Sequence, residues 1–285
     1  MKVIKKIASM QKEIERLRIH GKKIGFVPTM GYLHDGHLSL IREARKKSNI
    51  VVLSIFVNPT QFGLGEDFNK YPRNEKHDFM LAKKEKVDYL FYPDVKEMYP
   101  VDDFQTSVIN RGISLKLESE FRPTHFDGVT TVVSKLFNIV KPHIAVFGEK
   151  DYQQSCVIKQ MVEDLNFDVK IIVAPIVRDT DGLALSSRNM YLSKAEREDA
   201  LVLNQALIFA DPIFQSGESN CYKIINKIKN FISKKKLASI DYVRAVDPDT
   251  LNDVTRLKKK MSVMVLLAVR IGKTRLIDNR RYFVK

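Results

Sequence analysis

The sequence lacks what several protein classes require. Its 285 residues include no tryptophan and only two cysteines, Cys156 and Cys221, which lie far apart in the chain. Two isolated cysteines argue against a disulfide framework or a cysteine metal site, and they favour a reducing cytoplasm. No apolar run approaches the ~20 residues that span a bilayer, and residues 1–6 contain no apolar core of signal-peptide length. We therefore expect a cytoplasmic globular protein with no membrane partner.

Negative charge is also in short supply. The chain has 48 Lys and Arg against 34 Asp and Glu, a net charge of +14. Residues 177–285 carry 21 basic and 12 acidic groups, whereas residues 1–176 carry 27 and 22. An RNA-binding protein that uses its basic C-terminal third is one hypothesis. The lysine runs at 234–236 and 258–260 have no interleaved aromatics for base stacking. A solvated surface that attracts anionic substrates is therefore favoured, and nucleic acid is not an expected partner.

The hydrophobic pattern alternates between strands and helices through residues 24–177. The run 50–57 is continuously apolar and rich in β-branched residues, which is typical of a buried parallel strand. Further strands are predicted at 24–28, 88–93, 144–147 and 169–177, and helices at 1–20, 38–47, 74–86, 128–140 and 153–166. This order predicts an α/β fold with a Rossmann-like, doubly wound parallel sheet.

A polar loop at 178–189 separates this region from the rest of the chain. Beyond it the pattern predicts helices at about 194–210 and 219–236, and strands at 240–246, 261–270 and 274–278. We expect a first domain at 1–177 and a smaller α+β domain at 178–285, joined by a mobile Ser-Ser-Arg loop.

The most informative motif is His34-Asp35-Gly36-His37, where the strand at 24–28 gives way to an amphipathic helix. Two histidines three residues apart lie on one face of the first helical turn. That turn offers unpaired backbone N–H groups and the positive end of the helix dipole, which favour a phosphate chain. The alternative is a polar helix start in which one histidine acts as a cap. The flanking strand and helix favour a nucleotide-using enzyme.

Other candidate groups follow strand ends, where ligands bind in doubly wound sheets. Lys150, in Gly148-Glu149-Lys150-Asp151, can neutralise a transferring phosphate. Leu185-Ser186-Ser187-Arg188 offers hydroxyls and a guanidinium for β- and γ-phosphates, on a loop able to close over a site. Gln61 and Gln154 are amides suited to hydroxyl and carboxylate oxygens. Taken alone, each of these segments equally describes a surface turn or a linker. His125 is as readily structural as ligand-binding, and no cluster resembles a protein-built metal site.

Five ordered segments together resemble the pantoate–β-alanine ligase (pantothenate synthetase) family, which uses a His-x-Gly-His site. They are Pro28–His37, Ser54–Phe62, Arg122–Val129, Phe147–Gln154 and Ser186–Asn189. The resemblance runs over nearly the whole chain and implies a Rossmann-like domain with a smaller C-terminal domain, usually as a homodimer. It implies ATP-dependent condensation of pantoate with β-alanine through pantoyl adenylate, releasing pyrophosphate and AMP. Mg²⁺ accompanies the ATP.

The resemblance also implies roles for individual residues. His37 is the general acid, with His34 and Lys150 as further catalytic groups. Pantoate is expected at Gln61 and Gln154, and β-alanine at Gln61, with Asn58 as a further contact. The implied ATP-binding residues are Met30, Gly31, Tyr32, Leu33, His34, Asp35, Gly36, His37, Gly148, Glu149, Lys150, Asp151, Val177, Leu185, Ser186, Ser187 and Arg188.

The helix terminus modifies one of these roles. The dipole disfavours added positive charge, so a neutral His37 that donates a hydrogen bond to phosphate is easier there than a protonated acid. The alternative function is another His-x-Gly-His nucleotidyltransferase, acting on a small phosphorylated metabolite. The segments around Gln61 and Gln154 favour a carboxylic-acid substrate instead.

Overall fold

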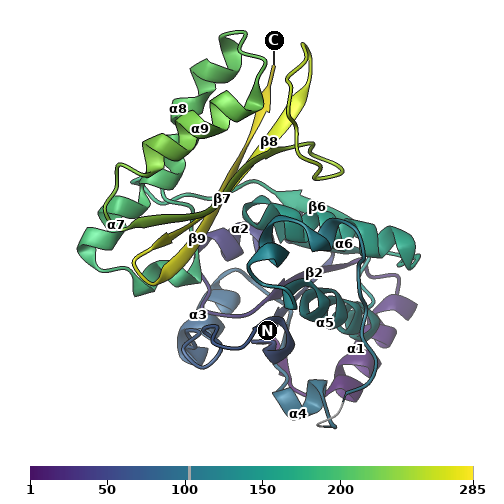
Figure 1. Cartoon of the computed structure of the whole chain (residues 1–285). Helices are drawn as coiled ribbons and strands as arrows, with labels where there is room; N and C mark the ends of the chain where they lie inside the picture. The colour runs from purple at the N-terminus through teal and green to yellow at the C-terminus, as the bar shows by residue number, and fades with distance from the viewer. Residues whose placement is uncertain (102–103, 285) are drawn as a thin grey trace. The chain divides into compact units, whose positions relative to one another are not determined.

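The computed structural model describes residues 1–101 and 104–284 and divides into two compact units (Figure 1). The first unit comprises Met1–Glu149 and Gln153–Pro175, and the second comprises Lys150–Tyr152 and Ile176–Lys285. Of the helices in the described residues, none combines the length and the hydropathy needed to cross a membrane.

The first unit is built on a parallel sheet, as the alternating pattern predicts, but the sheet has six strands instead of the five predicted. The strands are β1 (Lys2–Ile4), β2 (Ile24–Thr29), β3 (Ile50–Ile55), β4 (Tyr89–Phe91), β5 (Ile144–Gly148) and β6 (Lys170–Ala174), in the order β1-β4-β3-β2-β5-β6. The central strand β3 is almost completely buried, because helices cover both faces of the sheet.

Alternate residues of each strand supply the two faces. Phe26 packs into the core on one face of the sheet, while the next residue, Val27, packs into a second core on the other face. This alternation follows from the two-residue period of a strand. The helices are α1 (Ile7–Ile19), α2 (Asp35–Lys47), α3 (Glu75–Lys84), α4 (Val95–Met98), α5 (His125–Val140) and α6 (Tyr152–Asp164). Short 3-10 helices are η1 (Pro59–Gln61), η2 (Ile113–Leu115), η3 (Leu117–Glu120) and η4 (Glu149–Asp151).

The strand order reverses at β2. The chain leaves β2 through α2 and returns in β3 on one side, whereas β5 pairs with β2 on the other side. Ligands of doubly wound sheets bind beyond the carboxyl ends of the strands at such a reversal. The loop that carries His34 and His37 leaves the sheet at this point.

The expected helix over residues 1–20 is wrong at its start. Residues 2–4 form the edge strand β1, which pairs in parallel with β4, and α1 begins only at Ile7. The predicted helix at 194–210 is two helices, α7 (Lys194–Ala200) and α8 (Val202–Gln215). The strand predicted at 169–177 is shorter, because β6 ends at Ala174 just before Pro175.

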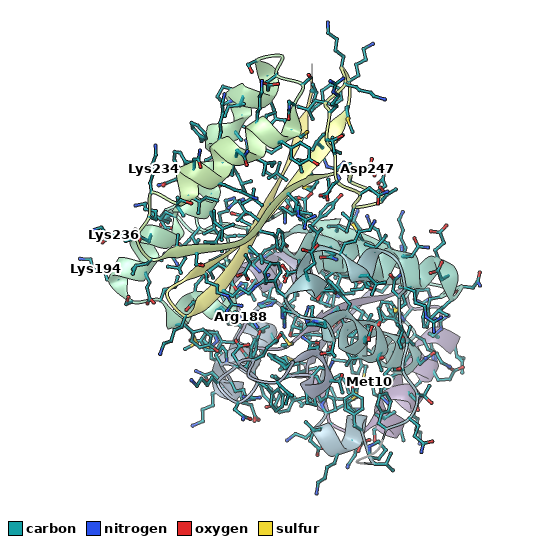
Figure 2. The ribbon with its side chains drawn as sticks, viewed as in Figure 1. Met10, Arg188, Lys194, Lys234, Lys236 and Asp247 are labelled. Carbon is teal, nitrogen blue, oxygen red and sulfur yellow. The ribbon has the colours of Figure 1, made fainter. Side chains whose placement is uncertain are left out.

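The second unit combines helices with an antiparallel sheet, in agreement with the expected α+β class. Its strands are β7 (Ala238–Val246), β8 (Ser262–Ile271) and β9 (Thr274–Phe283), in the order β7-β8-β9. Helices α8 and α9 (Cys221–Ile232) share one core with this sheet, and the 3-10 helix η5 (Ser187–Tyr191) precedes α7. Lys194, Lys234 and Lys236 are exposed on this unit, whereas Met10 is fully buried in the first (Figure 2).

Candidate functional site

The loop between β2 and α2 is held in a left-handed conformation. Gly31 has a φ of +84° and Tyr32 a φ of +49°. The Thr29 hydroxyl donates to the carbonyl of Ser54 at 2.8 Å and accepts from the N–H of Gly31 at 3.2 Å. Two successive positive φ values turn the chain sharply from the strand end into the helix start.

A buried carboxylate pins this loop from α3. Asp78 is 2% exposed, and its two oxygens accept from the N–H of Tyr32 at 2.8 Å and of Leu33 at 2.7 Å. An anion that accepts two backbone N–H groups is a strong anchor. Asp78 is not among the residues that the sequence predicts for the site. The one sequence signal that could have identified Asp78 is its position four residues before Ala82, which places an acidic side chain on the buried side of α3.

His34 and His37 lie side by side at the start of α2, as their spacing predicts. His34 is the N-cap residue and His37 lies in the first turn, with the ring centroids 4.0 Å apart. The backbone N–H of His34 donates to Nδ1 of His37 at 3.4 Å. A ring nitrogen that accepts carries no proton, so a neutral His37 has its proton on Nε2. Nε2 is then the hydrogen-bond donor of this ring.

Gln61 comes from the next strand end and meets the same loop. Its Nε2 donates to the sulfur of Met30 at 2.9 Å, and its Oε1 accepts from Nδ2 of Asn58 at 3.2 Å. Both Asn58 and Gln61 are buried. The structure thus brings together the segments after β2 and β3, which lie about 30 residues apart in the sequence.

The first turn of α5 contacts the backbone of Gln61. Nδ1 of His125 donates to the carbonyl oxygen of Gln61 at 3.0 Å. Burial, reinforced by the Arg122 guanidinium, lowers the pKa of His125 to about 4, so the ring is neutral at pH 7. A Cβ on Gly128 would lie 2.5 Å from the backbone of Gln61, so only glycine permits this approach. His125 therefore has a structural contact with a predicted site residue.

Two adjacent glutamines on α6 differ in their surroundings. Gln153 is buried, and its Nε2 donates to the carbonyls of Ile113 at 2.9 Å and Lys116 at 2.7 Å. This amide holds a loop in place. Gln154 is half-buried, and the candidate residues Gly148 and Glu149 end β5 and begin η4 in the same unit.

The remaining predicted residues belong to the second unit. The carbonyl of Lys150 accepts from Nδ2 of Asn279 at 2.9 Å, and its Nζ lies 3.5 Å from the Asp151 carboxylate. The N–H of Leu185 donates to the carbonyl of Val177 at 3.0 Å, so these two candidates are neighbours.

The loop that carries Ser186, Ser187 and Arg188 is fastened within the second unit. The Ser186 hydroxyl accepts from the N–H of Arg188 at 3.3 Å, and Ser187 is buried. Arg178 forms a bidentate ion pair with the buried Asp278 of β9, at 2.7 and 2.9 Å. This geometry is the strong form of an ion pair and fixes the start of the loop.

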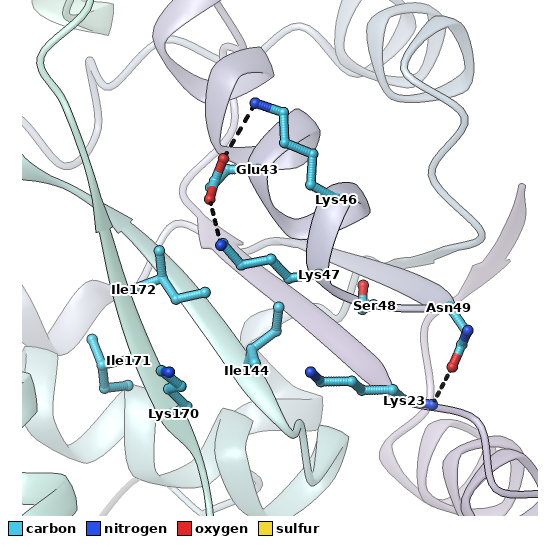
Figure 3. Close-up of a pocket in the computed structure, with 10 residues that line it drawn as sticks. All are labelled: Lys23, Glu43, Lys46, Lys47, Ser48, Asn49, Ile144, Lys170, Ile171 and Ile172. Carbon is cyan, nitrogen blue, oxygen red and sulfur yellow. Dashed lines mark hydrogen bonds and ion pairs between the residues drawn. The ribbon is translucent and has the colours of Figure 1, made fainter.

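A separate pocket of about 710 Å³ opens at the amino end of the sheet (Figure 3). It contains none of the predicted site residues, and its charged lining is mainly lysine: Lys23, Lys46, Lys47 and Lys170. Lys46 and Lys47 each lie 3.4 Å from Glu43. Surface lysines partly neutralised in this way do not define a ligand site. Among the described residues, no three His, Cys, Asp or Glu side chains gather as a metal-binding group.

A doubly wound parallel sheet with His-x-Gly-His at a helix start beside the strand-order reversal defines a nucleotide-using enzyme of the His-x-Gly-His class. Comparison with known proteins gives the family. The model of the pantoate–β-alanine ligase family matches residues 2–281. The chain belongs to the pantoate–β-alanine ligase family.

Individual relatives agree over almost the whole chain. It is 53% identical to pantothenate synthetases of Caldicellulosiruptor saccharolyticus and Thermoanaerobacter pseudethanolicus, each over 98% of both chains. A crystal structure of pantothenate synthetase from Thermus thermophilus superimposes with a TM-score of 0.92 at 42% identity, covering 98% of this chain and 99% of that one. A crystal structure of a pantoate–β-alanine ligase from Francisella tularensis, complexed with β-γ ATP and β-alanine, superimposes with a TM-score of 0.81 at 38% identity. It covers 98% of this chain and 97% of that one.

Proposed function

We propose that this chain condenses pantoate with β-alanine in an ATP-dependent reaction that passes through pantoyl adenylate. The pantoate carboxylate attacks the α-phosphorus and expels pyrophosphate. The β-alanine amine then attacks the activated acyl carbon and expels AMP. Family membership supports the overall reaction. The observation that carries the nucleotide chemistry is the His34–His37 pair at the start of α2.

The proposed ATP-binding residues are those that the family resemblance implies. They are Met30 to His37, Gly148, Glu149, Lys150, Asp151, Val177 and Leu185 to Arg188. The start of α2 supplies backbone N–H groups and a positive dipole end for phosphate oxygens. Lys150 and Arg188 supply cations for the charge that builds up during adenylyl transfer.

His37 is proposed to act as a neutral hydrogen-bond donor in the transition state. Its Nδ1 accepts from the N–H of His34, so Nε2 carries the proton that can be donated to a phosphate oxygen. Losing one such donor costs about 10²–10³-fold in rate in enzymes that depend on it. In His37→Ala we expect adenylate formation to fall by far more than ATP affinity.

Single-turnover formation of pantoyl adenylate, set beside the ATP dissociation constant, separates the two effects. His20→Ala is the control, because His20 is an exposed histidine whose ring bonds to the carbonyl of Arg16 and which is not among the proposed site residues. Equal losses of adenylate formation and ATP affinity in His37→Ala would contradict the donor role.

Pantoate is assigned to Gln61 and Gln154, and β-alanine to a position near Gln61. Neutral amides recognise a carboxylate and hydroxyls without titrating. Gln61 already faces the Met30–His37 loop, which supports an acid bound next to the nucleotide.

ATP–pyrophosphate exchange tests the reaction directly. Exchange should require pantoate, and AMP should appear only after β-alanine is added. A different His-x-Gly-His nucleotidyltransferase would exchange with a phosphorylated metabolite and ignore pantoate, and that result would remove the proposal.

Three further features belong to the proposal. Mg²⁺ would enter with the ATP phosphates, so EDTA should abolish exchange and added Mg²⁺ should restore it. The active form would be a homodimer, which light scattering behind gel filtration measures. A cytoplasmic location is supported by the low cysteine content, two in 285 residues.

A further inference from the structure

Asn58, the N-cap residue of the 3-10 helix η1 that carries Gln61, is a buried amide whose donors and acceptor are all engaged. Its Oδ1 accepts from the hydroxyls of Tyr99 at 2.8 Å and Thr60 at 3.0 Å. Its Nδ2 donates to the carbonyl of Gly128 at 3.1 Å and to Oε1 of Gln61 at 3.2 Å. The residue is 1% exposed, so water cannot replace these partners.

These partners permit only one orientation of the Asn58 amide. A backbone carbonyl accepts and never donates, so the nitrogen must face Gly128, and with it Gln61. The oxygen then faces Tyr99 and Thr60, whose hydroxyls both donate. Flipping the amide would set an oxygen against the Gly128 carbonyl and leave two buried groups mismatched, at about 1–3 kcal/mol each.

The orientation of Asn58 fixes that of Gln61. Because Nδ2 of Asn58 donates, the Gln61 atom facing it must be the acceptor Oε1. The amide nitrogen of Gln61 therefore points the other way, toward the sulfur of Met30 at 2.9 Å. A thioether is a weak acceptor, so this N–H is readily transferred to a stronger one such as a carboxylate oxygen.

We propose that Tyr99 is a positioning residue that, through Asn58, sets Gln61 to present its N–H₂ group to the pantoate carboxylate. The inference rests on the proposed pantoate site at Gln61. It adds the direction of that hydrogen bond and the residue that enforces it.

The surroundings of Tyr99 suit this task. Its ring lies against Phe56 and Phe104, with centroids 6.2 and 5.1 Å away, and Nζ of Lys135 lies 5.2 Å from the ring centroid. These contacts hold the hydroxyl in one place. Burial raises the pKa of Tyr99, so the hydroxyl keeps its proton as a donor at neutral pH.

The test compares Tyr99→Phe with Tyr89→Phe. Each variant removes one phenolic hydroxyl from the first unit, but the Tyr89 hydroxyl donates to Glu13 at 3.0 Å and has no link to Asn58. In pantoate-dependent exchange, Tyr99→Phe should raise the pantoate KM about 3–10-fold, the effect of losing one hydrogen bond. The ATP KM should stay within about twofold of wild type, since the Tyr99 hydroxyl acts through Asn58 on Gln61, which is proposed to bind pantoate and not ATP. Tyr89→Phe should change neither KM.

Thr60 shares the acceptor and provides a second variant. Thr60→Val removes the other hydroxyl at Asn58 and should shift the pantoate KM in the same direction by less, and the double variant should exceed either single one. Thr60 is exposed, so Thr60→Val carries the test if Tyr99→Phe fails to fold.

Gln61→Glu keeps the shape of the side chain but removes its hydrogen-bond donor. This variant should abolish pantoate-dependent exchange while ATP still binds.

The outcomes separate this inference from the function. Wild-type exchange that ignores pantoate would remove the proposed function itself. Wild-type exchange that needs pantoate, with Tyr99→Phe and Thr60→Val both indistinguishable from Tyr89→Phe, would overturn only the role of Tyr99. Equal rises in the pantoate and ATP KM would also overturn it, because they indicate a general structural loss. Retained pantoate affinity in Gln61→Glu would show that Gln61 accepts instead of donates.

Discussion

At the scale of single residues, His125 couples the site to pH. This half-buried residue packs against the segment that it supports, and its pKa of about 4 lies below the ordinary 6.5. The folded protein therefore resists protonation of a group that the unfolded chain protonates readily. The neutral ring makes its full contribution to the free energy of unfolding above pH 6.5. This contribution is lost as the pH falls from 6.5 toward 4.

We expect this group to contribute up to about 3 kcal/mol to that loss, from the separation of its two pKa values. Urea unfolding of wild type and His125→Asn between pH 7 and 4.5 measures it. Asparagine keeps an N–H donor for the Gln61 carbonyl but does not titrate. With decreasing pH, the free energy of unfolding should fall more steeply in wild type than in His125→Asn. The difference in slope should correspond to at most one extra proton taken up on unfolding. Parallel curves would mean that His125 titrates alike in both states.

At the scale of elements, the turn from β2 into α2 depends on Gly31. A Cβ there would lie 2.9 Å from Cγ2 of Ile55 and 3.0 Å from Oδ2 of Asp78, at a φ of +84°. Gly65 has almost the same φ, +82°, but a Cβ there would meet nothing within 4 Å. The two positions therefore share the backbone cost and differ in crowding.

We expect Gly65→Ala to cost about 1–2 kcal/mol, the left-handed penalty alone. Gly31→Ala should cost about 1–3 kcal/mol more, because crowding near Asp78 also disturbs the Tyr32 and Leu33 N–H bonds. Urea unfolding gives both values, and the ATP KM should rise only in Gly31→Ala. Equal destabilisation of the two variants would show that the loop absorbs the extra carbon.

The same elements show what local pattern can and cannot predict. The buried run of β3 and the periodicity of α2 are local signals, so the parallel sheet and the position of His34 and His37 follow from them. Strand β1 carries no such signal, since its three residues are a strand only because they pair with β4, about 85 residues later.

Buried polar contacts, like strand β1, depend on partners that are distant in the sequence. Asp78 lies 46 residues from Tyr32, and Tyr99 lies 41 from Asn58. Spacing along the chain does not reveal such partners. The sequence therefore predicts candidate ligand-contacting residues such as Gln61, while the groups that hold them in place require the fold.

At the scale of the whole molecule, each unit is stabilised by its own interior, and the charge excess lies on the surface. Most arginines of the second unit are already paired with carboxylates within it. The pairs are Arg178–Asp278, Arg197–Asp179, Arg197–Asp181, Arg244–Asp253, Arg270–Asp241, Arg275–Asp241 and Arg280–Asp211. The net positive charge is thus carried largely by lysines.

Those lysines are poorly arranged for RNA. Lys234 and Lys236 are exposed, but Lys234 lies over the ring of Phe231 at 5.7 Å, and that ring stacks on Phe209 with centroids 4.8 Å apart. A base would have to displace these contacts to stack there. Lysines without stacking partners bind phosphate only through charge, and that attraction weakens steeply with salt.

We therefore expect a single-stranded RNA to bind weakly at low salt and to be released at about 150 mM, where charges more than ~8 Å apart are screened. Fluorescence anisotropy across a salt series measures this. Lys234→Glu/Lys236→Glu should weaken the low-salt binding further, because it inverts two exposed charges. Pantoate-dependent exchange should be unchanged, since neither lysine belongs to the proposed site. Saturable RNA binding that survives about 150 mM salt and is lost in the double variant would instead establish a nucleic-acid surface on the second unit.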